Sequence, residues 1–212
     1  RHSNNGSLLS KSRLLFLAEF RERFAERVIA EMRGVSDGQG RSPFWDGLGQ
    51  HFFRMAFSQA DYLSGVGDKS FIAELMPQHP VYSALLPEEA RAVIGEVHPH
   101  TRPALAMLKS EGFQDSGYVD IFDAGPTVIT PLAQIRAVRD SDVYPVLAGT
   151  VTDGELWLLC NRRLANFRVC LAPVLYCEDE LQVPPEALQR LQLAGGDTVR
   201  AVPLVAQRKD KL

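Results

Sequence analysis

The chain has 212 residues, a formal net charge of −3 at pH 7, 45% hydrophobic residues and 23% charged residues. This length fits a single large α/β domain or one full domain with a small one, and the composition is that of a globular protein. The small net charge excludes a bulk electrostatic footprint for nucleic acid or an anionic membrane, and no apolar run approaches the roughly 20 residues of a membrane span.

The three cysteines, Cys160, Cys170 and Cys177, all lie late in the chain. Their odd number and their spacing do not fit a zinc site, so we expect reduced thiols in the core of a cytoplasmic protein, and no metal. No signal peptide is visible. The chain does not begin with methionine, which suggests a processed or truncated protein.

The first part of the chain alternates between helical and strand-like patterns. Residues 7–27 carry apolar side chains at helical spacing and predict an amphipathic helix. Residues 27–34 predict a short buried strand that ends at Gly34. Pro43 and Gly49 bracket a predicted short helix, and the aromatic run 51–57 predicts a strand.

The rest of the chain changes character at about residue 131. Residues 58–113 are predicted to be mostly helical, and 118–123 alternate like a strand. Short β-like runs follow at 143–149, 155–161 and 167–174, and the chain closes with a short helix, a Gly-Gly-Asp turn and a strand. We therefore predict an α/β protein with a core at 1–130 and a small β-rich C-terminal extension at 131–212.

The opening stretch RHSNNGS is a polar loop placed directly before the first predicted helix. Backbone N–H groups at a helix N-terminus lack intrahelical partners, and together with the helix dipole they attract anions. Asn4, Asn5, Gly6 and Ser7 are therefore candidates to surround a pyrophosphate, with Arg1 adding a charge-assisted contact. The alternative is an ordinary helix-capping loop.

The order of these elements is similar to the acyl-CoA-binding core of the GNAT superfamily of N-acyltransferases. In that superfamily the signature loop reads Arg/Gln-x-x-Gly-x-Gly/Ala; Arg1 and Gly6 match it, and Asn4 replaces the first glycine. The resemblance implies a GNAT-like core within residues 1–130. It also implies that this core is N-terminally incomplete, because GNAT folds place further helices and a strand before the loop.

Longer strings resemble arginine N-succinyltransferases, including arginine/ornithine succinyltransferase subunits. They are LLSKSR, VIAEMRG, SPFWDGLGQHFFRMAFSQADYLSG, FIAELMPQHPVY, VIGEVHPHTRPALAMLKSEGF and YVDIFDAGPT. The resemblance implies transfer of succinyl from succinyl-CoA to the α-amine of L-arginine, or of ornithine, in arginine catabolism. Succinyl-CoA would be a co-substrate, no cofactor would be bound permanently, and the chain would form a homo- or hetero-oligomer with a related subunit.

Family members are longer than this chain, which leaves a rival interpretation. The chain would then be a non-catalytic or incomplete subunit that needs an N-terminal partner segment to form the acyl-CoA site. In the catalytic interpretation, the backbone donor for the oxyanion would come from the strand that precedes Arg1 in the family.

His98, in the stretch GEVHPH, matches the proposed proton donor of the family. An imidazole suits this role because its pKa lies near neutrality. The alternative is a histidine on a surface turn. A covalent route through an acyl-cysteine is also open, although each cysteine lies in an apolar β-like run without a histidine nearby in sequence.

An arginine substrate calls for carboxylates that face its guanidinium, and the succinyl carboxylate calls for a cation. The carboxylate candidates are Glu31, Glu74, Asp120 and Asp123, and the cation candidates are Arg33, Arg54 and Lys69. Asp120 and Asp123 are an odd number of residues apart in the sequence, so in a regular strand their side chains face opposite sides. They can share a pocket only if the strand ends or bulges.

Overall fold

The computed structural model describes residues 4–67 and 70–205 and has a mixed α/β fold, which confirms the predicted class. The chain forms two compact units. The barrel unit contains the described residues up to Val28, the segment Ser110–Gly112 and the described residues from Thr130 onward. The sheet unit contains Ile29–Lys109 and Phe113–Ile129. Neither unit is one continuous stretch of sequence.

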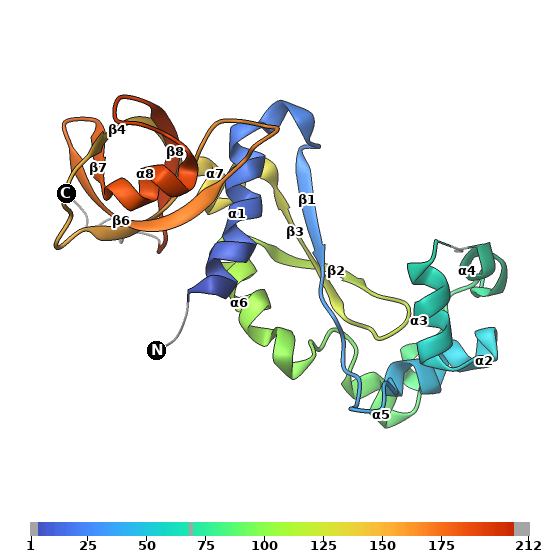
Figure 1. Cartoon of the computed structure of the whole chain (residues 1–212). Helices are drawn as coiled ribbons and strands as arrows, with labels where there is room; N and C mark the ends of the chain where they lie inside the picture. The colour runs from blue at the N-terminus through green and yellow to red at the C-terminus, as the bar shows by residue number, and fades with distance from the viewer. Residues whose placement is uncertain (1–3, 68–69, 206–212) are drawn as a thin grey trace. The chain divides into compact units, whose positions relative to one another are not determined.

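Five strands of the barrel unit close on themselves in the order β4-β7-β6-β5-β8 (Figure 1). Their bounds are β4 Asp142–Ala148, β5 Glu155–Cys160, β6 Val169–Cys177, β7 Glu180–Val183 and β8 Thr198–Pro203. The β4–β7 pair is parallel and the other pairs are antiparallel; β8 closes the barrel by pairing with both β4 and β5. The strands predicted at 143–149, 155–161 and 167–174 are confirmed.

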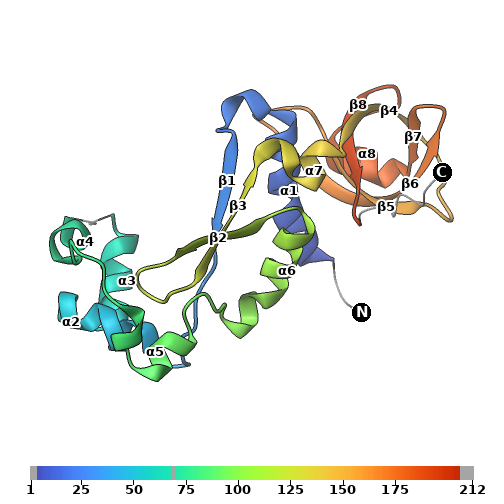
Figure 2. The ribbon, with the colours of Figure 1, turned by 180° about the vertical axis from the view of Figure 1, so that it is seen from behind.

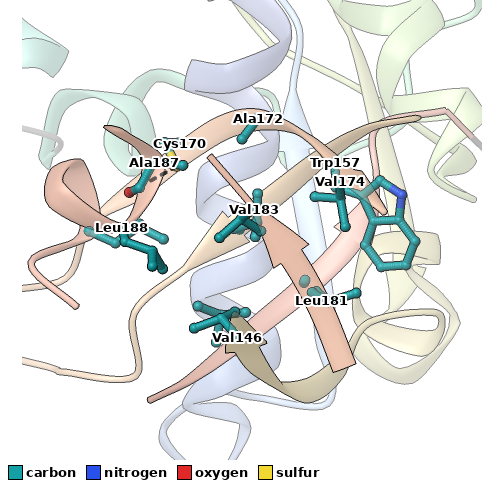
Figure 3. Close-up of a cluster of buried hydrophobic side chains, with 13 residues drawn as sticks. Val146, Trp157, Cys170, Ala172, Val174, Leu181, Val183, Ala187 and Leu188 are labelled. Atoms are coloured by element: carbon teal, nitrogen blue, oxygen red, sulfur yellow. Dashed lines mark hydrogen bonds between the residues drawn. The ribbon is translucent and has the colours of Figure 1, made fainter. Parts of the chain in front are cut away.

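The barrel is filled by side chains that alternate inward along its strands, as period-2 patterning requires. Figure 3 shows Val146, Leu181 and Val183 in this core, beside Leu188 of helix α8 (Pro185–Leu191). Helix α8 separates β7 from β8, so the predicted final helix and strand are also confirmed.

Helix α1 (Asn5–Glu19) packs against α7 (Arg136–Arg139) and β5 within the barrel unit. The predicted helix 7–27 is therefore too long. After α1 the chain turns through the 3₁₀ helix η1 (Arg21–Arg23) and enters strand β1 (Arg27–Glu31). The turn brings Phe24 back to within 5.9 Å of Phe16, ring centre to ring centre, so packing of aromatic rings replaces the last helical turns.

A buried ionic cluster joins four segments of the barrel unit. Glu111 is fully buried and its carboxylate lies 2.9 Å from Lys11 Nζ and 2.8 Å from Arg136 Nη2. Lys11 also donates to the Leu204 carbonyl (2.8 Å), and Arg136 donates to the Pro203 carbonyl (2.9 Å). The cluster thus ties α1, the segment around Glu111, α7 and the end of β8 together.

The sheet unit is built on three strands in the order β1-β3-β2, with β2 at Gln114–Val119 and β3 at Pro126–Pro131. Strands β2 and β3 form an antiparallel hairpin, and the turn of that hairpin ends beside helix α3 (Figure 2). The strand predicted at 118–123 is therefore displaced: β2 ends at Val119, and 120–123 form the turn.

Short helices make up the rest of this unit. They are the π-helical turn η2 (Trp45–Gly49), α2 (Gln50–Phe53), α3 (Phe57–Gly65), α4 (Ser70–Leu75), η3 (Ser83–Leu85), α5 (Glu88–Ala92), η4 (Pro99–Thr101) and α6 (Arg102–Ser110). The prediction of helices over 58–113 holds for most of this segment. No helix within the described residues is both long and apolar enough to span a membrane.

The prediction of a strand at 51–57 is wrong, because this stretch lies in α2 and the start of α3. Helical geometry lets Phe53 stack on the fully buried Trp45, with ring centres 5.1 Å apart. Phe122 stacks on the same indole at 5.4 Å, and Phe57 contacts it edge-on at 6.3 Å. A cluster of aromatic rings around Trp45 therefore decides the local structure.

Candidate active site

The candidate site centres on His98, which precedes the short 3₁₀ helix η4 in the sheet unit. Its backbone N–H donates to the Arg33 carbonyl (2.9 Å), and its own carbonyl accepts from the Thr101 N–H (2.9 Å) and Thr101 Oγ1 (2.8 Å). The imidazole Nδ1 accepts a hydrogen bond from the His100 N–H (3.2 Å). Both the backbone and the ring of His98 are therefore held in place.

This hydrogen bond assigns the tautomer of the ring. A nitrogen that accepts cannot carry the proton, so neutral His98 carries its proton on Nε2. The pKa of His98 lies below its ordinary value because partial burial disfavours the imidazolium, and Arg33 and His100 add to this effect. Asp123 acts in the opposite direction. At neutral pH the ring is uncharged and presents an Nε2–H group.

Asp123 braces the segment that leads to His98. Its Oδ2 accepts from the Gly34 N–H (2.7 Å), and its Oδ1 accepts from the Gly125 N–H (2.9 Å). Gly34 in turn forms an isolated antiparallel bridge with Val97. A Cβ atom at Gly34 would overlap the Asp123 carbonyl oxygen, and one at Gly125 would overlap the Met32 carbonyl oxygen, so both positions need glycine for close backbone approach.

Asp120 and Asp123 both lie in the turn after β2, so the strand does end before them. Asp120 Oδ1 accepts from the N–H groups of Phe122 (2.7 Å) and Asp123 (3.3 Å). The pKa of Asp120 is raised because burial disfavours the carboxylate, and repulsion from Asp123 and Asp61 adds to this effect although the backbone hydrogen bonds oppose it. The two carboxylates therefore have different surroundings: Asp123 is nine-tenths buried, whereas Asp120 is only partly buried.

The remaining substrate candidates lie at the edge of this arrangement. Glu31 is the exposed last residue of β1. Arg33 is exposed, donates from Nη2 to Ser36 Oγ (2.7 Å), and lies close enough to His98 to affect its pKa. Arg54 is an exposed residue in the left-handed conformation (φ 52°) that ends α2. Glu74 is exposed in α4, and Lys69 lies outside the described residues.

The predicted anion loop is largely helical. Asn4 is the N-cap of α1 and makes no side-chain capping hydrogen bond, while Asn5, Gly6 and Ser7 form the first turn. Asn4 to Gly6 are exposed. Arg1 lies outside the described residues. The first turn therefore belongs to a helix of the barrel unit, and the side chain of its N-cap residue does not cover the first backbone N–H groups.

The cysteines do not behave alike. Cys160 and Cys170 are buried, as predicted, and burial raises the pKa of Cys160 to about 12 and that of Cys170 to about 11. Cys177 is exposed, so the prediction of a core thiol is wrong there. It falls at the end of β6, where the alternation of buried residues stops. Within the described part of the chain, no three His, Cys, Asp or Glu side chains group as metal ligands.

Comparison with known proteins assigns this chain to a family. Residues 1–137 match the family described as "Arginine N-succinyltransferase beta subunit", and residues 143–203 match the C-terminal domain of the same subunit. The chain belongs to the arginine N-succinyltransferase beta subunit family. The family resemblance proposed from the sequence strings is thereby confirmed.

Individual members of the arginine N-succinyltransferase family agree with this assignment. An arginine N-succinyltransferase subunit beta from Pseudomonas aeruginosa is 55% identical over 206 residues. An arginine N-succinyltransferase from Yersinia pseudotuberculosis is 50% identical over 214 residues. In both cases the match covers 97% of this chain and 61% of the relative, so the chain spans less than two thirds of the relatives' length.

A solved structure of the family has the same fold. The arginine/ornithine succinyltransferase subunit AI from Pseudomonas aeruginosa superposes with a TM-score of 0.86 at 35% identity, over 97% of this chain and 59% of that chain.

Sequence reasoning overlooked part of the site of this arginine N-succinyltransferase family member. The sequence predicts only that Gly34 ends a strand. In the structure Gly34 lets the Asp123 carboxylate reach its backbone N–H across 89 residues of sequence, and Gly125 lets the hairpin turn approach the backbone of Met32. The sequence signal for this contact was a glycine at a strand end together with a distant Asp-Ala-Gly turn. Turn-forming residues do not, however, reveal which distant residue the aspartate contacts.

Proposed function

We propose that this chain forms part of an enzyme that transfers succinyl from succinyl-CoA to the α-amine of L-arginine. Membership of the arginine N-succinyltransferase family supports the reaction, and the solved relative named for arginine and ornithine leaves ornithine as a second amine substrate. The observation that carries the proposal is His98: a neutral ring with one nitrogen engaged by the backbone and Nε2–H available.

In the proposed mechanism the neutral α-amine attacks the thioester carbonyl carbon, and the C–N bond forms as the C–S bond breaks. The proton that the attacking nitrogen loses ends on the departing sulfur, which leaves as CoA thiol, and the neutral His98 ring donates a hydrogen bond from Nε2–H to that sulfur as negative charge develops on it. The lowered pKa of His98 supports this role, because it keeps the ring neutral near the amine it must not repel. The raised pKa values of Cys160 and Cys170 disfavour the acyl-cysteine route at these two thiols.

The first turn of α1 is proposed to hold the CoA pyrophosphate in a GNAT-like core. The exposed Asn4, Asn5 and Gly6, with Ser7, support this role, because they begin a 15-residue helix whose N-cap side chain, that of Asn4, makes no capping hydrogen bond. Glu31 and Asp120 are proposed to face the amino-acid substrate, and Arg33 the succinyl carboxylate. Asp123, whose two carboxylate oxygens accept from the Gly34 and Gly125 N–H groups, is proposed to hold the turn that carries Asp120. We further propose assembly with a related subunit, which the beta-subunit name of the relative supports.

The reaction is tested by measuring release of CoA thiol from succinyl-CoA and L-arginine with the full-length protein. His98→Ala should lower kcat by about 100-fold or more, the usual loss when a preorganised donor to a developing negative charge is removed. His51→Ala is a matched control, because His51 is an exposed histidine of α2 in the same unit. Equal turnover in both variants would remove His98 from the mechanism.

The pyrophosphate site is tested at Gly6, where an added Cβ meets open space. Gly6→Asp places a negative charge in the first turn, which favours the helix but repels phosphate. Its KM for succinyl-CoA should rise several-fold relative to Gly6→Ala, while the KM for arginine is unchanged. Identical values for the two variants would exclude the α1 site.

The rival candidate is a subunit that is inactive alone and completes its acyl-CoA site with a partner segment. This candidate is supported by the coverage of the relative, because the chain matches only 61% of the length of that protein. If the protein releases CoA only after the related subunit is added, the rival is correct, whereas turnover by the protein alone excludes it.

A further inference from the structure

A small pocket in the sheet unit lies beside the hairpin turn that contains Asp120. Its volume is about 110 Å³, and its walls are apolar, formed by residues that include Phe44, Leu48, Phe52, Met76 and Ile121. Asp120 is the one charged residue among the described side chains that line it. A single carboxylate in an apolar pocket is the pattern that recognises a cation on an apolar stem.

The carboxylate of Asp120 is only partly satisfied. Its Oδ1 accepts from two turn N–H groups, at 2.7 Å and 3.3 Å, but none of the described residues donates a hydrogen bond to Oδ2. Burial raises the pKa of Asp120, and repulsion from Asp123 and Asp61 adds to this effect although the backbone hydrogen bonds oppose it. A bound cation would relieve both the burial penalty and the repulsion between the carboxylates.

Asp123 is poorly suited to the same task. Both of its oxygens accept backbone hydrogen bonds, from Gly34 at 2.7 Å and from Gly125 at 2.9 Å, and it is nine-tenths buried. Of the two turn carboxylates, Asp120 is therefore the one that remains available to a ligand.

The pocket is connected to His98 through a short chain of hydrogen bonds. Asp120 Oδ1 accepts from the Asp123 N–H, and the Asp123 carboxylate holds the Gly34 N–H. Gly34 follows Arg33, whose carbonyl accepts from the His98 N–H at 2.9 Å. The turn that carries Asp120 is thus tied, through Asp123 and the Arg33–Gly34 segment, to the segment that carries His98.

We propose that this pocket is the subsite for the side chain of the amino-acid substrate, with Asp120 binding the guanidinium and Phe52 and Met76 packing against its methylene stem. Aromatic faces and carboxylates are the two partners that a guanidinium prefers. This assignment rests on the proposed function, and it names Asp120 as the residue that selects a cationic side chain.

The test compares L-arginine with L-citrulline, which has the same shape but an uncharged ureido group. Asp120→Asn keeps an acceptor for the Phe122 N–H and removes only the charge. It should raise the KM for arginine about 10- to 100-fold, the cost of losing a hydrogen bond to a charged group. It should leave the KM for succinyl-CoA unchanged and abolish the preference for arginine over citrulline.

Asp115→Asn is the matched control, since Asp115 is an exposed carboxylate of the same hairpin that pairs with Lys109 at 2.9 Å. It should behave like the wild type. Calorimetric titration of the full-length protein with arginine and with citrulline gives a readout that does not depend on turnover, and thermal melting confirms that the variants fold.

The outcomes separate the two proposals. If the wild-type protein binds arginine but releases no CoA, and Asp120→Asn loses arginine binding, the pocket is supported and the proposed reaction is refuted. Succinyl transfer with an unchanged arginine KM in Asp120→Asn, or with a raised KM for succinyl-CoA instead, overturns the pocket and leaves the reaction intact. A wild-type protein that neither binds nor succinylates arginine overturns both.

Discussion

Replacing Glu111 by Gln should destabilise the barrel unit strongly. Glu111 Oε1 accepts from Lys11 Nζ (2.9 Å), Arg136 Nε (3.0 Å) and Arg136 Nη2 (2.8 Å), and Oε2 accepts from the Ala137 N–H (2.9 Å). In either orientation, a Gln side chain turns its NH₂ group toward at least one of these donors. It also leaves two buried cations without a counter-charge.

Breaking a buried ion pair by removing one partner costs about 3–5 kcal/mol, because the remaining charge stays buried. All three side chains of the cluster are more than nine-tenths buried, so this range applies. For a chain of this size, such a loss lowers Tm by about 6–20 °C. Urea titration followed by circular dichroism measures the free energy of unfolding directly.

The pH dependence provides a second measurement. Burial alone raises the pKa of Glu111, but the hydrogen bonds and charges of Arg136 and Lys11 outweigh it, so the pKa lies below the ordinary value of 4.5. A depressed carboxyl pKa stabilises the fold above the unfolded-state pKa, and this contribution is lost as pH falls through the folded-state value. The stability difference between wild type and Glu111→Gln should therefore narrow below about pH 4.5.

Asp140→Asn is the control for this experiment. Its partner Arg139 is exposed and lies 2.7 Å away, and exposed ion pairs contribute about 0–1 kcal/mol. Glu111→Gln should lower the free energy of unfolding clearly more than Asp140→Asn does. An equal loss in both variants, or a difference that stays constant down to acid pH, would contradict a stabilising role of the buried cluster.

Three further predictions concern individual residues. Thiol reagents at pH 8 should modify Cys177 and spare the two buried cysteines until the protein is unfolded; three reactive thiols in the native state would contradict their burial. Arg33→Gln should raise the pKa of His98, because the positive charge of Arg33 helps to lower that pKa. If NMR titration gives the same imidazole pKa in the variant and the wild type, Arg33 does not affect His98. Gly125→Ala should cost about 1–3 kcal/mol through overpacking against backbone, whereas Gly38→Ala, where a Cβ meets open space, should be tolerated in the same urea titration.

Local patterns predicted well those elements whose residues pack on one face. The alternating C-terminal strands were found, because a period of 2 is visible without knowledge of a partner. A helix was also found near the N-terminus, but it is not clearly amphipathic, since it buries Lys11 and exposes Leu9. The run 51–57 was assigned the wrong structure. The periodicity of so short an aromatic run does not distinguish a strand from a helix. The run is helical around Phe53 because that geometry lets Phe53 stack on Trp45.

The candidate site was predictable in its residue types and less so in their roles. His98 came from the resemblance to the family, and the structure adds its tautomer and the direction of its pKa shift. Asp120 and Asp123 were equivalent candidates in the sequence. Their separation into a partly exposed carboxylate and a backbone brace depends on where β2 ends and on Gly34, which lies far away in the chain.

The sequence by itself determined the family, the α/β class and the β-rich C-terminal part, and it pointed to the histidine that the proposed mechanism uses. Only the tertiary structure decided that Glu111 is buried between Lys11 and Arg136, and which turn carboxylate remains open to a ligand. The physical reason is the range of the interactions. Helical and strand periods arise between neighbours in the chain, whereas burial, charge pairing and pKa shifts arise between residues that only the fold brings together.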